Sequence, residues 1–405
     1  MELSQCKERL DAWFSDKEPE MLSMLERIVN MDSFTTDAAD VNKVGEVVTG
    51  WLAEAGFHTA KLPKKPAPAD EQWMNGLGNV FSARTHSVEC GPGVAFIGHM
   101  DTVFPAGTAG ARPFRLDRAT GPGVTDMKAG IVQNMFVARA LKELGLMDVP
   151  MTLTFSPDEE LGSPSTTPIL GEQLNGAQAV ICTEPGYPGG GVTLERKGSG
   201  HMFLEIMGIS AHAGRCYQDG ASAILELAHK ILAFDAYVDL DHDTTVNTGL
   251  VNGGTSANSV APNASARIHI TFKTLEAGRR LAEALRAETA KNHIPGTGSH
   301  ISGGVRLPPL VPTPGVMKLF SLAEQAGELI GYSVHSAPSK GTAESGYCSS
   351  VLGVPAICSM GPEGSNLHSA DEYMIPSTFV PRCKLAALTA IQAARAFAPA
   401  AKVSL

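Results

Sequence analysis

The chain has 405 residues, more than one hydrophobic core usually supports, so we expect two domains. Hydrophobic residues make up 43% and charged residues 18% of the sequence, a globular composition that argues against disorder or a fibrous repeat. The formal net charge is -10, and no run of Lys or Arg is present to bind phosphate groups. We therefore expect neither nucleic acid nor an anionic membrane as a partner.

Membrane and secretion signals are missing from the sequence pattern. No stretch is apolar for long enough to span a bilayer, and residues 1–14 carry charges throughout, unlike a secretory signal. The 7 cysteines are scattered without a C-x-x-C pair, which argues against a disulfide framework and a thiolate zinc site. Reduced cysteines predict a cytoplasmic location.

The first half of the chain alternates helical and strand patterns. Residues 44–52 place their apolar side chains on one helical face, and the apolar run 94–97 predicts a buried strand. A helical pattern follows Asp126. Two further strands are predicted over 151–155 and 179–182. Strands that alternate with helices indicate a mostly parallel sheet, in which the carboxyl ends of the strands form the ligand-binding edge.

The character of the sequence changes near Gly198. From there strand and helix patterns indicate a β-α-β-β-α-β order, typical of a ferredoxin-like α+β domain; its predicted segments are 201–208, 224–232, 265–274, 275–290 and 300–306. The Pro-rich segment 308–314 predicts a linker back to the first domain, which closes with a strand at 354–359 and a helix over 379–397. We predict an α/β domain of residues 1–196 and 313–405 with an inserted domain of residues 197–312.

Residues that can bind metal follow the predicted strands of the first domain. They are His99, Asp101, Asp126, Glu159, Glu160, Glu184 and His368. Taken singly, a His after a strand is more often a hydrogen-bonded core residue, and a Glu-Glu pair is usually a solvated face. Several convergent buried carboxylates, however, require cations. Imidazole with carboxylate suits zinc, manganese, cobalt or iron, and two metals that share one carboxylate need about five to six donors.

Five short motifs carry a resemblance to a known family. They are residues 98–104 (GHMDTVF), 123–130 (GVTDMKAG), 158–163 (DEELGS), 184–186 (EPG) and 367–373 (LHSADEY). In this order they resemble the motifs of the M20 metallopeptidase family, in the branch of carboxypeptidase G2. The resemblance covers nearly the whole chain and implies a catalytic domain with an inserted lid and dimerisation domain.

The resemblance implies a site for two divalent metal ions per subunit, zinc first, with manganese or cobalt as alternatives. Asp126 would bridge both ions. His99 and Glu184 would complete one site, and Glu160 and His368 would complete the other.

The resemblance also implies the roles of two more carboxylates. Asp101 would orient His99 through the second ring nitrogen, and Glu159 would act as the general base on metal-activated water. The peptide bond between Asp126 and Met127 is expected to be cis.

Two motifs of the insert resemble those of the family's lid. In residues 209–214 (ISAHAG), His212 would stabilise the oxyanion in the active site of the partner subunit, which implies a homodimer through the lid domain. A surface or interface histidine is the plain alternative. In residues 253–258 (GGTSAN), Asn258 would contact the substrate.

One position departs from the family pattern. Thr271 stands where the family usually has an Arg that holds the substrate carboxylate, and His269 replaces an Asp. Lys273, Arg215 or backbone donors near Gly341 are possible substitutes, although Lys lacks the bidentate fork of Arg.

The expected function is hydrolysis of a small-molecule substrate: the amide bond of an N-acyl amino acid, or that of the C-terminal residue of a peptide-like compound. A deacylase of an amine without an α-carboxylate is the first alternative, and a catalytically silent binding relative is the second.

No G-x-S-x-G or H-E-x-x-H motif supports another hydrolase class, and residues 188–191 (PGGG) are read as a loop rather than a phosphate site.

Overall fold

The computed structural model describes residues 1–397, which form two compact units. Unit 1 comprises Met1–Ala67, Trp73–Arg196 and the described chain from Leu310 onward. Unit 2 comprises Pro68–Gln72 and Lys197–Pro309. The insert predicted from the sequence starts at the same residue as the main segment of unit 2, whereas the short segment 68–72 was not expected in it. Residues 398–405 of the predicted first domain lie outside the described residues.

Unit 1 is built on a six-stranded sheet of order β1-β2-β4-β3-β5-β12. The strands are β1 (His58–Lys61), β2 (Phe81–Arg84), β3 (Val94–His99), β4 (Met151–Ser156), β5 (Ala179–Cys182) and β12 (Ala356–Ile357). β4, β3, β5 and β12 run parallel to one another; β2 pairs antiparallel with β4, and β1 pairs antiparallel with β2. Both β3 and β4 are buried along their whole length because helices cover both faces of the sheet. This largely parallel α/β sheet confirms the predicted fold class.

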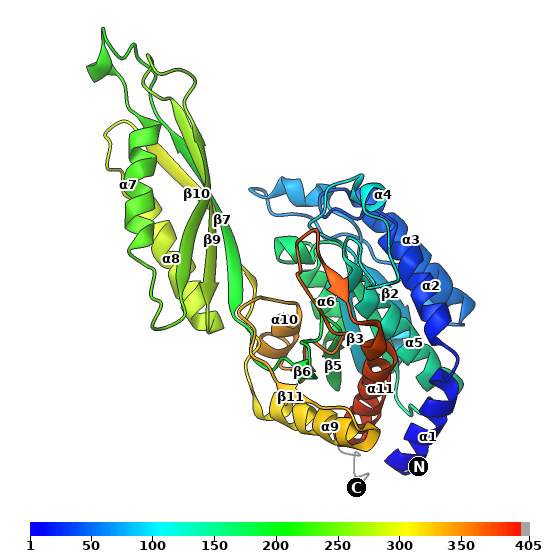
Figure 1. Cartoon of the computed structure of the whole chain (residues 1–405). Coiled ribbons are helices and arrows are strands. Elements are labelled where there is room, and N and C mark those ends of the chain that lie inside the picture. Colours follow the sequence, from blue (N-terminus) through cyan, green and yellow to red (C-terminus); the bar gives the residue numbers. More distant parts are fainter. Residues whose placement is uncertain (398–405) are drawn as a thin grey trace. The chain divides into compact units, whose positions relative to one another are not determined.

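Helices cover the two faces of this sheet (Figure 1). α5 (Ala129–Glu143) and α11 (Phe379–Ala396) contact each other and β3, and α6 (Thr167–Leu174) and α10 (Ser345–Ser350) lie on the opposite side. The remaining helices of unit 1 are α1 (Leu3–Phe14), α2 (Glu18–Val29), α3 (Ala38–Glu54), α4 (Thr108–Ala111) and α9 (Pro314–Ile330). No helix of the described chain is both long and apolar enough to cross a membrane.

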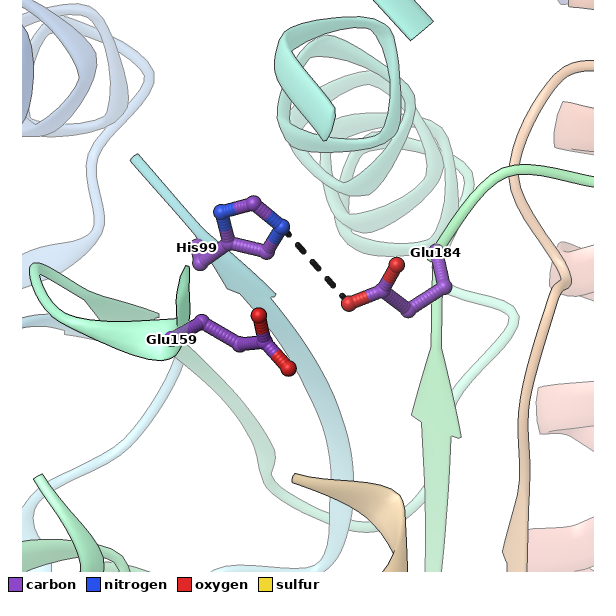
Figure 2. A group of neighbouring side chains, drawn as sticks. All are labelled: His99, Glu159 and Glu184. Atoms are coloured by element: carbon purple, nitrogen blue, oxygen red, sulfur yellow. Dashed lines mark ion pairs between the residues drawn. The ribbon is translucent and has the colours of Figure 1, made fainter. Parts of the chain in front are cut away.

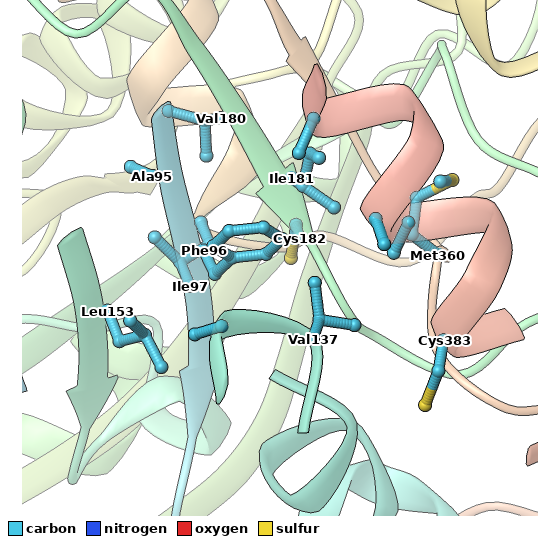
Figure 3. Packing of buried hydrophobic residues seen from close by; sticks show 14 of the residues in the cluster. Ala95, Phe96, Ile97, Val137, Leu153, Val180, Ile181, Cys182, Met360 and Cys383 are labelled. Carbon is cyan, nitrogen blue, oxygen red and sulfur yellow. The ribbon is translucent and has the colours of Figure 1, made fainter. Parts of the chain in front are cut away.

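The core of unit 1 joins the sheet to its helices (Figure 3). Phe96 of β3 and Ile181 of β5 pack with Val137 of α5 and Cys383 of α11, and all four side chains are completely buried. Two small strand pairs complete the unit: β6 (Gly191–Val192) with β11 (His335–Ser336), and β13 (Gly364–Ser365) with β14 (Tyr373–Met374). The rigid core therefore lies directly beneath the carboxyl ends of β3, β4 and β5.

Unit 2 is a four-stranded antiparallel sheet of order β10-β7-β9-β8. The chain forms β7 (Gly198–Met207), α7 (Ala223–Asp235), β8 (Thr245–Gly253), β9 (Asn263–Phe272), α8 (Leu275–Thr289) and β10 (Gly298–Leu307). Alternate residues of β9 are buried, because one face of the sheet packs on α7 and α8. This topology confirms the ferredoxin-like insert.

Candidate metal centre

Three neighbouring parallel strands bring the candidate ligands to one edge of the sheet. His99 is the last residue of β3, Glu159 and Glu160 form a short 3-10 turn after β4, and Glu184 follows β5. Because β4, β3 and β5 are adjacent and parallel, their carboxyl ends lie together.

Asp126 and His368 reach the same place from irregular segments. Asp126 lies in the turn Val124–Lys128 before α5, in extended backbone with φ -114° and ψ 89°. The Asp126–Met127 peptide bond is cis, as the motif resemblance led us to expect. His368 lies between β13 and β14 in a left-handed conformation with φ 60°, and its side chain is half-exposed.

Two histidines face the two oxygens of Asp126. Nε2 of His99 lies 3.2 Å from Oδ1 of Asp126 and 3.6 Å from Oε1 of Glu184. Nε2 of His368 lies 3.2 Å from Oδ2 of Asp126 and 3.2 Å from Oε2 of Glu160. Donors about 2.0–2.1 Å from a tetrahedral zinc are roughly 3.3 Å apart. The set around His99 and the set around His368 therefore each have the spacing of ligands to an ion of their own.

The carboxylate of Glu159 lies beside the first of these groups. Figure 2 shows it next to His99 and Glu184, and ligand atoms of these three residues lie within 4.8 Å of one another. One ligand atom each from His99, Asp126 and Glu160 also falls within 4.8 Å. His99 therefore stands between the two sets of carboxylates.

Burial makes the negative charges of this cluster costly. It raises the pKa of Glu184 to about 8 and that of Glu159 well above its ordinary value. Burial alone would lower the pKa of His99, but hydrogen bonds to Asp101 and Asp126 outweigh it and raise the value well above normal. Without cations, protons must therefore compensate the carboxylates. A set of two imidazoles and several buried carboxylates fits divalent ions, which would take the place of those protons.

Asp101 ties His99 to the turn after β4. Its carboxylate is fully buried, accepts a hydrogen bond from Oγ1 of Thr35 at 2.8 Å, and accepts the backbone N–H groups of Glu159 and Glu160, each at 3.2 Å. Oδ1 of Asp101 lies 3.4 Å from Nδ1 of His99, while its backbone oxygen is nearer, at 3.0 Å. Both contacts leave Nε2 of His99 directed at the carboxylates.

Two further buried carboxylates were not singled out from the sequence. Glu372 accepts the backbone N–H groups of Gly123, Thr125 and Asp126 at 2.9, 2.9 and 3.0 Å, and so fixes the turn that carries Asp126. Glu372 lies inside the 367–373 motif, and this position could have marked it as a candidate site residue. Glu344 accepts a hydrogen bond from Oγ of Ser163 at 2.8 Å, and burial raises its pKa to about 7. Nothing near Glu344 in the sequence pointed to this position.

Unit 2 gathers three of the four residues expected there to contact substrate. The backbone N–H of Ala213 donates to the carbonyl oxygen of Asn258 at 3.0 Å, so His212 and Asn258 lie on adjacent segments. The backbone N–H of Arg215 donates to the His212 oxygen at 3.1 Å in the same turn. The side chains of all three residues are exposed.

Lys273 lies at the other end of the unit 2 sheet. The register pairs Met207 with Asn263 near the His212 turn and Gly198 with Phe272 next to Lys273. Thr271 uses its hydroxyl in a 2.7 Å hydrogen bond with Thr245. His212 and Lys273 are therefore too far apart within this unit to contact the same small ligand.

Gly341 belongs to unit 1 and is exposed. Its backbone N–H donates to Oγ of Ser339 at 3.2 Å, and its carbonyl oxygen accepts from Nη1 of the buried Arg196 at 3.3 Å. The contacts with Ser339 and Arg196 therefore fix the position of the loop around Gly341.

An open α/β sheet with imidazole and carboxylate donors at its carboxyl edge is typical of metal-dependent hydrolases. Residues 95–392 match the model of peptidase family M20/M25/M40, and the chain belongs to this family.

Relatives of the chain span most of its length. Carboxypeptidase G2 from Pseudomonas sp. (strain RS-16) is 24% identical over 376 residues, which cover 91% of this chain and 88% of the relative. An M20 family metallo-carboxypeptidase from Sulfolobus solfataricus has a similar structure, with a TM-score of 0.73 at 16% identity, covering 93% of this chain and 99% of the other. A tripeptidase from Staphylococcus aureus gives 0.69 at 18% identity, with coverage of 93% and 99%.

Proposed function

We propose that the protein is a dinuclear metal-dependent hydrolase of carboxypeptidase or aminoacylase type. The observation that carries this proposal is the pair of histidines on the two oxygens of Asp126. Asp126 would bridge two ions, with His99 and Glu184 on one and Glu160 and His368 on the other. Zinc suits this donor set, with manganese and cobalt as alternatives.

The chain's own residues would manage the proton. Two divalent ions, when bound, polarise the scissile carbonyl and lower the pKa of the attacking water. Glu159 stands beside His99 and Glu184, on a turn fixed by Asp101, where its carboxylate can take the proton of that water. The same carboxylate then delivers the proton to the leaving nitrogen, so that the amine departs neutral.

We further propose that His212 serves a partner subunit. The chain enters and leaves unit 2 at the end where β7 begins, and His212 follows the far end of this ten-residue strand, roughly 33 Å away. The outer surface of unit 2 also exposes apolar side chains: Leu232 of α7 is 73% exposed, and Leu250 and Val251 of the edge strand β8 are 63% and 60% exposed. An edge strand with such residues is suited to pairing with a second copy of the chain.

The proposed substrate is small and carries an amide bond. The names of the relatives, a carboxypeptidase and a tripeptidase, support an N-acyl amino acid or a small peptide. Because Thr271 stands in place of the usual Arg, we favour Arg215, Lys273 or another cation as the group that holds the carboxylate; a deacylase of an amine without an α-carboxylate is the alternative. All seven cysteines are unpaired, which supports a cytoplasmic location.

The test is a panel of N-acyl amino acids and dipeptides offered to the metal-loaded protein and to Glu159→Gln. We expect turnover by the wild type and a loss of at least about 100-fold in kcat for the variant, with unchanged metal content by elemental analysis. Near-normal turnover by Glu159→Gln would remove the assigned base, and less than one metal ion per active chain would remove the dinuclear site.

A further inference from the structure

A cavity of about 690 Å³ in unit 1 adjoins the loop that carries His368. Its lining residues lie between 111 and 121, where they include Arg112, Arg115, Arg118 and Gly121, and between 366 and 373, where they include Asp371 and Tyr373. The second group flanks His368, while Gly121 precedes the turn of Asp126. The cavity therefore shares the His368 loop with the metal centre and lies next in sequence to the Asp126 turn, and its volume suits a small-molecule ligand.

Three arginines within seven residues of sequence face this cavity, although the chain as a whole is acidic, with a net charge of -10. Asp371 is the acidic residue among the lining residues. Among the described residues, Arg112, Arg115 and Arg118 form no salt bridge within 4.0 Å. Three positive charges against one negative charge leave an excess that an anionic ligand would neutralise.

Aromatic rings hold two of the guanidinium groups in place. The guanidinium carbon of Arg112 lies 4.8 Å from the ring centre of Phe104, and that of Arg118 lies 4.1 Å from the ring centre of Tyr373. Nη1 of Arg112 also donates to the carbonyl oxygen of Ser369, at 3.4 Å. A guanidinium held over an aromatic ring keeps N–H groups for a ligand and loses little conformational freedom when it binds a carboxylate.

We propose that this arginine cavity binds a carboxylate of the substrate. The inference rests on the proposed hydrolase and names a feature of its substrate class: an anionic group held by unit 1 on the His368 side of the metal centre. That carboxylate belongs either to the amino acid that is released or to the far end of the acyl group. The same chemistry recognises both, and the substrate series below separates them.

Direct binding provides a test that needs no catalysis. Glutarate is titrated calorimetrically into the metal-loaded wild type, into Arg115→Gln/Arg118→Gln, and into Arg279→Gln/Arg280→Gln. The last variant removes the same charge from exposed positions on α8 of unit 2. We expect equal affinity in the wild type and the control and at least tenfold weaker binding in the cavity variant. Equal binding by all three proteins would overturn the proposal, because the metal centre alone would then explain it.

Kinetics with matched substrates identify which carboxylate is bound. An N-acetyl amino acid is compared with its C-terminal amide, which lacks the α-carboxylate. An N-glutaryl amino acid is compared with its N-pentanoyl counterpart, which lacks the acyl carboxylate. We expect the cavity variant to lower kcat/KM at least tenfold for the member of one pair that carries the carboxylate and to leave the member that lacks it within twofold. A loss shared by all four substrates would overturn the proposal. If no amide is cleaved by the wild type, the proposed function fails, while the glutarate titration still decides the cavity.

Discussion

Some buried carboxylates of unit 1 face the histidines, others hold backbone, and Asp101 does both. Asp126, Glu160 and Glu184 have oxygens within 3.6 Å of an imidazole nitrogen. Glu372 instead accepts three backbone N–H groups, and Asp101 accepts two. Chemistry at the site therefore depends on residues that need not touch a metal or a substrate, because they fix the turns that carry the ligands.

Glu372→Ala tests this division between ligands and supports. The change leaves three buried N–H groups without an acceptor, so we expect the free energy of unfolding to fall by about 2 kcal/mol or more and metal affinity to drop. Urea unfolding and a competitive metal titration measure the two effects. Asp371→Ala, at the exposed neighbouring position, is the matched control and should stay within about 0.5 kcal/mol of the wild type. A Glu372→Ala protein as stable and as metal-rich as the control would contradict the assigned support.

At the level of elements, strands with long continuous apolar runs were predictable, whereas the four-residue β2, although buried, was not. β3 and β4 appear in the sequence as continuous apolar runs because both of their faces are covered. β8 could not be located, because it is an edge strand with exposed Leu250 and Val251 and no alternation of apolar residues. The helices α1, α2 and α9 also went unpredicted, although they contribute Leu10, Leu25 and Leu319 to the core.

Part of the candidate site was also predictable from the sequence. Ligands at the ends of β3, β4 and β5 follow from the rule that parallel strands present their carboxyl ends at one edge. Asp126 and His368 were candidates by residue type alone, and the family motifs supplied their roles, because they lie in irregular segments that no periodicity marks. The arginine cavity was not predicted, because its two lining segments, at 111–121 and 366–373, are distant in sequence and meet only in the folded chain.

The register of β9 leads to a prediction about carboxylate recognition. Lys273 and Arg215 lie at opposite ends of the unit 2 sheet, so the two substitutions should not have the same effect. If the arginine cavity holds the far end of the acyl group, the α-carboxylate needs a separate cation. In that case we expect one of Lys273→Ala and Arg215→Ala to lower kcat/KM for an N-acetyl amino acid by about tenfold, without affecting its C-terminal amide. The other variant is its control. Equal kcat/KM for acid and amide in the wild type would favour the deacylase alternative.

For the whole molecule, metal removal should affect both activity and stability. Convergent buried carboxylates repel one another without cations, and ions that bind the native state alone stabilise it by mass action. We expect dialysis against a chelator to abolish turnover and lower the melting temperature by several degrees, and zinc to restore both. The Asp126→Asn protein should show a much smaller shift on chelation, because the shared ligand is altered. An unchanged melting temperature of the wild type after chelation would argue against metal ions bound at this site.

Subunit exchange tests whether the dimer is needed for catalysis. His212→Ala and Glu159→Gln proteins should each be nearly inactive, while a mixture should regain part of the activity. In a mixed dimer one site has an intact base and receives an intact His212 from the partner. Mass spectrometry of an isotope-labelled subunit confirms exchange. Exchange without recovered activity would mean that His212 acts within its own subunit or not at all.

The way in which unit 2 joins unit 1 has a consequence for the history of such proteins. The chain leaves unit 1 at Arg196 and returns at Leu310, and the backbone N–H of Arg196 donates to the oxygen of Leu310 at 3.0 Å. The two cut ends of unit 1 are thus neighbours already joined by a hydrogen bond, a gap that a short turn could close. An insertion attached in this way can be replaced, lengthened or reshaped without disturbing the sheet beneath the metal centre. Unit 2 can therefore diverge in sequence while the residues of the metal centre in unit 1 are inherited unchanged.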